Sequence, residues 1–538
     1  MRTFLFSFTL FFSLFFSSFD LVAQAPFPYR ILLEEVSVPN LPGLHSYAFA
    51  QYDGKWVLIG GRIDGLHARQ PFNAFPANSN NTEIYVVDIQ SKQVWSSSVN
   101  SLSTGLKEQL QSTNMNFFQS DSTLYIIGGY AFSVSKNDHM TFPNLTAVSV
   151  PGLIDAIMNN ASITPYFEQI TDTRFAVTGG QLGKIGATFY LVGGHQFDGW
   201  YNPMGHSTYT QTYSNQIRSF KINNGQGQLS ISDYQSVTDA VHLHRRDYNL
   251  LPQIFPDGSK GYTMSSGVFQ VTADLPYLYP IDIRASGHQP ITDFNQYLSN
   301  YHCSSVSLYD SVSNAMHNLF FGGMSQYYYN NGNLIKDNQV PFVNTISRLS
   351  RSSDGSLNEY KVNTQMPGLK GSSAEFIPYH DLLDTDFDVI RMDYFEGDSI
   401  VLGHIFGGIS SSMLNPFNSN QTSNTSADAS IFKVTLIYDE LASVSKLNGA
   451  NPHRISVSPN PVREELQVRF DLANDADVDF MISNVSGQVV NKGSFDHCEK
   501  GSHSFGINTD SLRDTGTYIL TVIFDGRFYT TEKFMKVK

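Results

Sequence analysis

The 538-residue chain has little of what would point to a disulfide scaffold, a nucleic-acid partner or a membrane span. Cysteine occurs only at Cys303 and Cys498, in parts of the chain that we expect to fold separately, so a disulfide framework is not expected. The formal net charge is −14 and no run of Lys and Arg is present, which argues against nucleic-acid binding. After the N-terminal segment, no stretch reaches the roughly 20 apolar residues that a transmembrane helix needs. We therefore predict neither a nucleic-acid partner nor a transmembrane protein.

Aromatic residues are abundant instead, with 40 Phe and 28 Tyr, while charged residues make up 15% of the chain. This balance is typical of strand-rich proteins that work outside the cytoplasm. The length is ample for a large β-domain and a second, smaller one.

The first residues have the pattern of a secretory signal peptide. One positive charge at Arg2 precedes the apolar stretch Thr3–Phe16, and Ala23-Gln24-Ala25 ends the segment. The alternative, an anchoring helix, would need a longer apolar run. We predict a signal peptide over residues 1–25, with cleavage after Ala23 or Ala25.

A hydrophobic strand ending in two glycines recurs along the chain, and a repeat of this spacing indicates a repeat architecture. Each copy lies between an alternating strand with an Asp turn and two further strands, so each unit has four antiparallel strands, as in a propeller blade. We interpret the glycines as scaffold, because glycine tolerates positive φ and close backbone approach. The copies are WVLIGG at Trp56–Gly61, LYIIGG at Leu124–Gly129, FYLVGG at Phe189–Gly194, NLFFGG at Asn318–Gly323 and GHIFGG at Gly403–Gly408.

A degenerate unit over Tyr248–Gly267 brings the number of blades to six. The orphan strand Tyr29–Val38 is expected to pair beside Ile431–Tyr438 and close the ring, leaving no free edge. The repeat resembles kelch-type propellers over Tyr29–Asp439. The predicted fold class is therefore all-β, with a six-bladed kelch-like β-propeller over residues 26–440.

A polar connector, residues 441–453, precedes seven short strand-like runs that predict a small β-sandwich over residues 454–538. This segment resembles the type A C-terminal sorting domain of the type IX secretion system of Bacteroidetes; the alternative is an immunoglobulin-like ligand-binding module. The resemblance implies the type IX secretion machinery as a partner and a secreted or outer-membrane cell-surface location. The residues that carry it include Pro459, Asn460, Pro461, Gly487, Gly516, Tyr518 and Lys533.

The connections after the glycine pairs are long and should gather on one face, around the channel mouth. Long loops that lack secondary structure of their own are often functional. Aromatic rings beside Arg, His and Asp suit carbohydrate, so we predict a glycan or cell-surface protein ligand here; alternatively these side chains only fill space between loops. The predicted ligand-binding residues are Arg62, His67, Arg69, His195, Asp198, Trp200, Arg246 and His302.

Three more specific functions, metal binding, radical copper oxidation and sialidase activity, each require residues that the sequence does not show. His242 and His244 have no identifiable third metal ligand. A radical copper oxidase would need a Tyr-His motif to accompany Cys303, and the sequence has none that matches. A sialidase would need repeated Asp-box turns, which are also missing. We predict no metal, cofactor or catalytic residue, and a binding module rather than an enzyme. The alternative is a sugar mutarotase-like enzyme, since some kelch propellers act through channel-mouth Arg and Glu, although Glu is scarce here.

Overall fold

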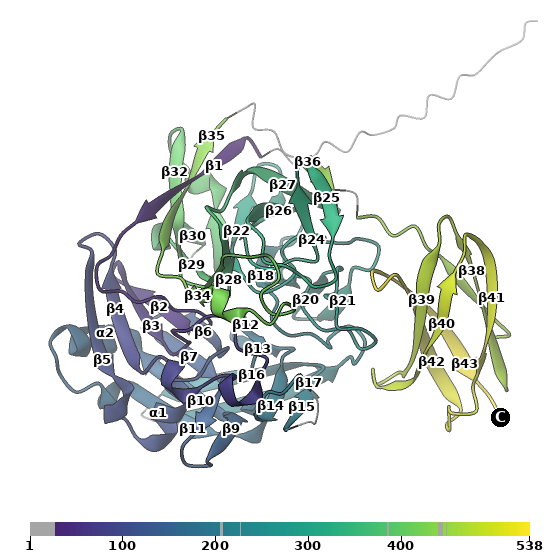
Figure 1. Cartoon of the computed structure of the whole chain (residues 1–538), viewed down its shortest axis with the longest axis horizontal. Helices are drawn as coiled ribbons and strands as arrows, with labels where there is room; N and C mark the ends of the chain where they lie inside the picture. Colours follow the sequence, from purple (N-terminus) through teal and green to yellow (C-terminus); the bar gives the residue numbers. More distant parts are fainter. Residues whose placement is uncertain (1–26, 205–207, 226–227, 385–386, 440–444, 448) are drawn as a thin grey trace, which may run out of the picture.

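The computed structural model describes residues 27–204, 208–225, 228–384, 387–439, 445–447 and 449–538, so the signal peptide predicted for residues 1–25 lies outside the described residues. The described chain is built mainly of β-strands arranged in many small sheets (Figure 1). The α-helices of the described residues, α1 (Thr104–Leu110) and α2 (Val150–Met158), are short and pack beside the first two sheets.

Six antiparallel four-stranded units follow one another along the described chain, each with the strand order that the repeat predicted. Sheets 1 to 3 contain β2 (Ala48–Tyr52), β3 (Lys55–Ile59), β4 (Glu83–Asp88) and β5 (Gln93–Ser98); β6 (Asn116–Ser120), β7 (Thr123–Ile127), β10 (Asn144–Ser149) and β11 (Phe167–Thr171); and β12 (Gln181–Ile185), β13 (Thr188–Val192), β16 (Gln216–Gly225) and β17 (Gln228–Thr238). Sheets 4 to 6 contain β18 (Leu250–Ile254), β19 (Lys260–Met264), β20 (Ile281–Arg284) and β21 (Gly287–Pro290); β22 (Ser304–Asp310), β23 (Ala315–Phe321), β26 (Thr345–Arg351) and β27 (Leu357–Gln365); and β29 (Glu375–Pro378), β32 (Ser399–Phe406), β35 (Ile431–Tyr438) and β1 (Tyr29–Val36).

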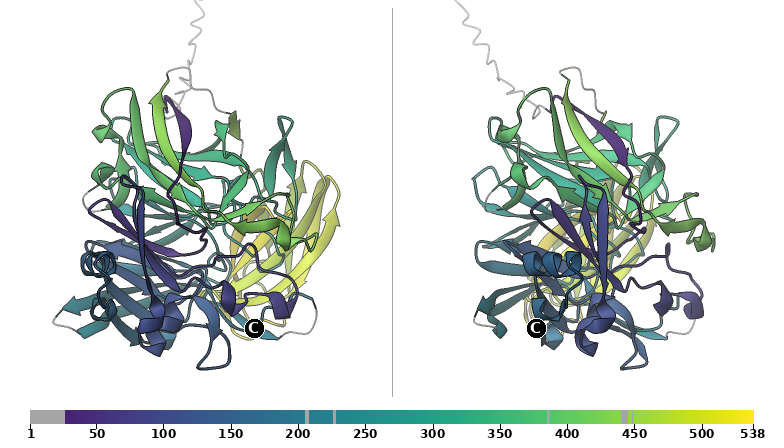
Figure 2. Two further views of the ribbon diagram at one scale, coloured as in Figure 1. Left: turned by 60° about the vertical axis from the view of Figure 1, so that its left-hand side comes forward. Right: turned by 90° about the vertical axis from the view of Figure 1, so that its left-hand side faces the viewer.

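The N-terminal strand β1 completes sheet 6, as the sequence predicted. It runs antiparallel to β35, with Tyr29 opposite Tyr438 and Val36 opposite Ile431. The first and last strands of this part of the chain therefore lie side by side (Figure 2), and β1 covers the edge that β35 would otherwise expose.

A closed cycle of backbone hydrogen bonds joins the segments that lead into the six first strands. Each amide in the cycle donates to the carbonyl of the equivalent residue in a neighbouring sheet, and all its members except His302 have positive φ. The cycle returns to its starting residue, so all six sheets are linked around one centre. Its bonds run from Ser373 to His302 (2.9 Å), His302 to Asp247 (2.8 Å), Asp247 to Gly179 (2.7 Å), Gly179 to Asn114 (3.1 Å), Asn114 to Ser46 (3.1 Å) and Ser46 to Ser373 (3.0 Å).

The second glycines of the pairs form another cycle, in which each glycine amide donates to a carbonyl in the segment before the first strand of the next sheet. A Cβ on Gly128 would lie 1.8 Å from the Val177 carbonyl oxygen, so this close approach requires glycine. In the degenerate fourth unit, Gly267 takes the place of the second glycine. The bonds run from the amides of Gly61, Gly129, Gly194, Gly267, Gly323 and Gly408 to the carbonyls of Ser112 (2.8 Å), Val177 (3.1 Å), Arg245 (2.8 Å), Asn300 (3.1 Å), Lys370 (2.9 Å) and Leu44 (2.8 Å).

The arrangement of six sheets has two sides, one at each end of the strands. The side with the connections between second and third strands is the loop face, and the opposite side, with the turns between first and second strands, is the turn face. The long loops were expected to lack secondary structure, but four of those described carry short strands that hold their shape. These strands are β8 (Tyr130–Ser133), β9 (Asp138–Thr141), β14 (His195–Gly199), β15 (Tyr209–Tyr213), β24 (Tyr327–Asn330), β25 (Asn333–Lys336), β33 (Ile409–Ser411) and β34 (Thr425–Ala427), with β28 (Leu369–Ser372) paired to β33.

Sheet 5 is extended on both sides. β31 (Phe387–Arg391), which pairs with β30 (Leu383–Asp384), lies parallel to β22, and β36 (Ser445–Leu447) pairs with β27. β36 belongs to the segment that the sequence predicted as a polar connector, and its Leu447 is buried. Part of that connector is therefore fixed to sheet 5.

The C-terminal part contains the seven strands that the sequence predicted, in two sheets that share one hydrophobic core (Figure 1). It docks on sheet 4, where the buried Tyr529 ring lies 4.6 Å from the ring of Tyr279. Both cysteines of the chain are buried and free, as expected. The strands are β37 (Ile455–Ser458), β38 (Glu465–Leu472) and β41 (Gly501–Asn508), and β39 (Ala476–Asn484), β40 (Val489–Cys498), β42 (Gly516–Phe524) and β43 (Phe528–Lys536).

Candidate ligand-binding site on the loop face

Arg62 directly follows the glycine pair after β3 and is 2% exposed. Its guanidinium donates to the Asp64 carboxylate from Nε (2.8 Å) and Nη2 (2.5 Å), and from Nη1 to Asn80 Oδ1 (2.8 Å). Burial opposes ionisation of Asp64, but hydrogen bonds from His45 and Arg62 lower its pKa to about 2. The Asp64 carboxylate is therefore ionised at neutral pH, and its hydrogen bonds with Arg62 hold the base of the first loop.

The His67 ring lies where three loops meet. It stacks on Phe75 with ring centroids 4.7 Å apart, and it meets Tyr201 (4.7 Å) and Phe417 (5.5 Å) edge-on. Tyr201 comes from the loop of sheet 3 and Phe417 from the loop of sheet 6. The loops of non-adjacent sheets 1 and 3 thus touch each other, as a shared site would require.

Arg69 extends this aromatic cluster toward solvent. Its guanidinium lies over the Phe417 ring at 5.4 Å from the centroid, and its Nη1 donates to the Asn418 carbonyl at 3.2 Å. A partly exposed cation on an aromatic ring can still offer hydrogen bonds to a ligand.

Three predicted residues, His195, Asp198 and Trp200, lie on or next to the β14–β15 hairpin. Gln211 Nε2 donates to His195 Nδ1 (2.8 Å), and the Thr141 amide donates to Asp198 Oδ1 (3.0 Å). Trp200 is 36% exposed and packs edge-on against His139, with centroids 4.6 Å apart. His195 and Asp198 therefore fix the hairpin, while Trp200 presents part of its ring to solvent.

Arg246 and His302 come from the segments that lead into the first strands. Arg246 forms an ion pair with Asp247 and donates from Nε to the Tyr213 hydroxyl at 3.3 Å. His302 Nε2 lies 3.6 Å from Glu375 Oε1. Burial lowers the pKa of His302 to about 4 and raises the pKa of Glu375 well above its usual range, so burial disfavours the charged form of both groups.

The charge of Arg246 acts on two of the other predicted residues, His67 and His195. Burial, and after it the Arg246 charge, lowers the pKa of His67 to about 4 and that of His195 well below its usual range. The structure thus brings residues of sheets 1, 3 and 4 into one electrostatic neighbourhood. Arg62 and His302 are instead engaged by Asp64 and Glu375.

The sequence reasoning missed a set of exposed apolar side chains on the same face. Apolar residues inside otherwise polar loops were the available signal, and their exposure in a folded protein is typical of interaction surfaces. The set comprises Ile63, Phe72, Val134, Met204, Leu334 and Leu414.

His242 and His244, which were weighed as metal ligands, have other partners. His242 Nδ1 lies 2.7 Å from the Tyr279 hydroxyl oxygen, and His244 Nδ1 lies 2.9 Å from Asn215 Oδ1. Among the residues that the structure describes, no group of three or more His, Cys, Asp and Glu side chains is arranged to hold a metal ion.

The motif residues of the C-terminal part hold its last strand, β43, in place and contact the N-terminal part of the chain. The Asn460 side chain donates to the Lys533 carbonyl (3.1 Å) and accepts from the Met535 amide (2.9 Å), between Pro459 and Pro461. Gly487 has a φ of 80°, and its carbonyl accepts from the Ala240 amide of the N-terminal part (2.7 Å). Gly516 begins β42, where the Tyr518 hydroxyl donates to the Asp514 carbonyl (3.0 Å).

Residues 456–537 match the family described as secretion system C-terminal sorting domain. Export by the type IX secretion system, and a secreted or cell-surface location, follow from this match. No helix in the described ranges is long and apolar enough to cross a membrane.

Two further comparisons concern the whole chain. No curated protein matches it. Among solved structures, one described as "Structure of YjhT" aligns with 77% of this chain and 100% of its own, at 12% sequence identity and a TM-score of 0.42.

Proposed function

We propose that residues 26–440 form a six-bladed kelch-like β-propeller that acts, after export, as a binding module. The two hydrogen-bond cycles support the architecture, because each joins the six sheets in one order and returns to its start. The pairing of β1 with β35 supports closure in the way that propellers avoid a free edge.

The proposed ligand is a glycan on the cell surface, bound at the loop face. The observation that carries this proposal is the meeting of three loops at His67, Tyr201 and Phe417, beside the exposed Trp200. Aromatic rings can stack on the apolar faces of sugars, while cationic groups donate hydrogen bonds to hydroxyl and carboxylate oxygens.

The predicted residues divide into two roles in this proposal. Arg69, Trp200 and Arg246 contact the ligand, because Trp200 exposes part of its ring and the partly exposed guanidinium groups of the two arginines can donate to sugar oxygens. The others hold the loops in place through the contacts described above; they are Arg62, His67, His195, Asp198 and His302.

A glycan array with the mature full-length protein tests the proposal. Replacing Trp200 by Ala removes a stacking surface, so we expect binding to weaken about tenfold, which corresponds to about 1.4 kcal/mol. The melting temperature should change little, because the ring is partly exposed.

The matched control is Val312→Ala, which removes an exposed apolar side chain on the turn face. Equal weakening by both substitutions would contradict a loop-face site. Retention of a protein from the cell surface in place of any glycan would assign the same face to a protein partner.

A further inference from the structure

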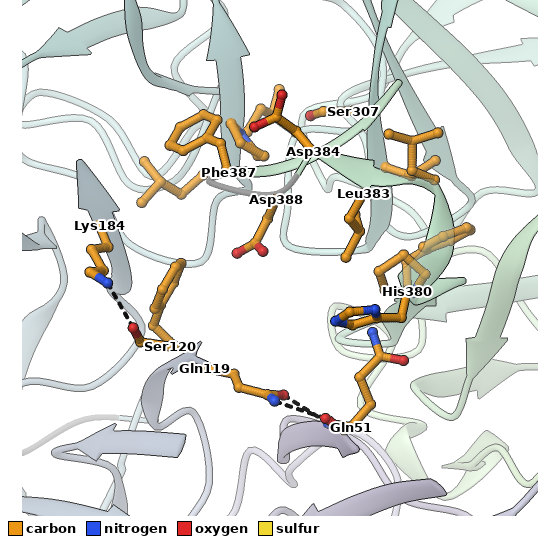
Figure 3. A pocket seen from close by; sticks show the side chains of 18 of the residues that line it. Gln51, Gln119, Ser120, Lys184, Ser307, His380, Leu383, Asp384, Phe387 and Asp388 are labelled. Atoms are coloured by element: carbon orange, nitrogen blue, oxygen red, sulfur yellow. Dashed lines mark hydrogen bonds between the residues drawn. The ribbon is translucent and has the colours of Figure 1, made fainter. Parts of the chain in front are cut away.

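A cavity of about 1030 Å³ is lined by residues at the turns between first and second strands, such as Asp121 and Gly186, so it lies toward the turn face. Figure 3 shows part of its lining. The first strands of all six sheets line it, so it occupies the centre that the sheets share. The lining residues include Gln51, Phe117, Lys184, Leu250, Ser305 and Phe376, one from each first strand.

One connection on this face is unlike its counterparts. The other connections between first and second strands are short turns, whereas residues 379–398, between β29 and β32, carry β30 and β31. β31 lies parallel to β22, with Leu308 opposite Ile390, and Lys260 of β19 forms an ion pair with Asp384 of β30 (2.8 Å). The described parts of this connection, residues 379–384 and 387–398, are therefore fixed beside the cavity by two different sheets. A long loop on a face of otherwise short turns indicates a functional role.

β31 directs the carboxylate of Asp388 into the cavity (Figure 3). Within the described residues, no hydrogen bond or ion pair engages this carboxylate, while the nearby lysines have partners. Lys184 Nζ donates to Ser120 Oγ (2.7 Å), and Lys260 is paired with Asp384. The cavity lining carries four carboxylates, those of Asp121, Asp381, Asp384 and Asp388, against the two amines of Lys184 and Lys260, so its net charge is negative.

The rest of the lining suits the carbon skeleton of a small ligand. Phe117, Phe118, Phe376 and Phe387 provide apolar rings, and the volume is at the upper end of the range for small-molecule sites. Phenyl faces also attract cations. A ligand with an ammonium group and a compact body would match both features.

We propose that this cavity is a second ligand site, which binds a small organic cation through a primary ammonium group held by Asp388. The ammonium donates to the carboxylate, and the aromatic rings cover the carbon skeleton. This site is independent of the glycan site proposed for the loop face.

The proposal makes binding depend on pH. Asp388 is exposed at the cavity wall, and desolvation by the protein around it raises the pKa of its carboxyl to about 6, against the opposing charges of Lys184 and His380. The other charged groups of the lining are Lys260, Asp384, Asp121 and Asp381. Because a carboxyl with a pKa of about 6 is ionised in about a tenth of the molecules at pH 5, binding should be about tenfold weaker there than at pH 7.5.

Titration calorimetry on the mature full-length protein tests this with three probes. Glucosamine carries an ammonium group on a sugar ring, N-acetylglucosamine keeps a similar ring without the charge, and putrescine carries ammonium groups on a linear chain. We expect at least one ammonium compound to bind and N-acetylglucosamine to bind at least tenfold more weakly. If only glucosamine binds, the ligand class is an amino sugar, and if only putrescine binds, it is a linear amine. If both bind, the site recognises the ammonium group itself.

Asp388→Asn should weaken binding of the ammonium compound at least tenfold and flatten its pH dependence. Glu396→Gln, which removes an exposed carboxylate from the same connection but outside the cavity lining, is the matched control and should bind normally. Trp200→Ala should also bind normally, which separates this site from the loop face. Failure of both ammonium compounds to bind, equal binding of N-acetylglucosamine, or unchanged binding by Asp388→Asn would overturn the proposal. Comparison of the three probes on the unsubstituted protein tests the proposed ammonium site even if a variant fails to fold.

Discussion

At the scale of single residues, burial decides which charged side chains are available to a ligand. Arg62 was predicted from sequence to contact a ligand, but its donors are engaged by Asp64 and Asn80 inside the first loop. Arg62→Ala would leave the Asp64 carboxylate without its charged partner. We therefore expect this substitution to lower the free energy of unfolding by about 3 kcal/mol, which denaturant titration would measure.

The matched control at this scale is Arg69→Ala, whose guanidinium reaches the Asn418 carbonyl at an exposed position. It should leave the free energy of unfolding within about 0.5 kcal/mol of the parent value, as exposed side chains usually do. An unfolding free energy for Arg62→Ala as high as that of Arg69→Ala would contradict a structural role for the ion pair.

At the scale of elements, β1 is expected to determine whether the N-terminal part stays intact. Deletion of residues 29–36 removes the strand that pairs with the outer edge of β35, so this edge becomes exposed. We expect aggregation, or a fall of the melting temperature by about 10 °C or more, seen in scanning calorimetry and size-exclusion chromatography.

Substitution of the exposed Arg30 and Glu35 by Ala keeps the backbone of β1 and serves as the control. This variant should melt close to the parent protein. A deletion variant that stays monomeric and equally stable would show that β1 is not needed to close the sheets.

At the scale of the whole molecule, the C-terminal part determines where the protein goes. Because residues 456–537 match the sorting-domain family, removal of residues 454–538 should leave the rest of the protein in the periplasm of a host with a type IX system. The same segment fused to a fluorescent protein behind a signal peptide should bring it to the cell surface. Fractionation and surface labelling would measure both, with Val312→Ala as the normally exported control. Normal surface levels of the truncated protein would contradict this role.

The dock between the two parts also belongs to this scale. Tyr529 of β43 lies against Tyr279, and the Gln270 side chain donates to the Gly526 carbonyl at 2.6 Å. The sorting domain therefore covers an aromatic surface of sheet 4 in the full chain. Truncated protein should be handled at low concentration in such experiments, because this apolar surface becomes exposed.

The amino-acid sequence by itself determined the four-stranded units, the strand order within them and the C-terminal domain, but not β30, β31, β36 or the short strands of the long loops. Alternating hydrophobic strands, Asp turns and the repeated glycine pairs are local patterns, and each predicts a hairpin without knowledge of the rest of the chain. The pairing of Tyr29–Val36 with β35 was also predictable, because an unpaired strand at one end of a repeat needs the edge at the other end.

Only the tertiary structure decided which side chains are free. Arg62 meets Asn80 eighteen positions away, and His67 meets Phe417 on another sheet. Lys184 and Asp388 line one cavity although they lie on β12 and β31. Residue types and spacing do not encode such contacts, because they depend on how the six sheets are arranged around a common centre. The length of residues 379–398 was the available signal for the cavity, but the side chain that enters it depends on the pairing of β31 with β22.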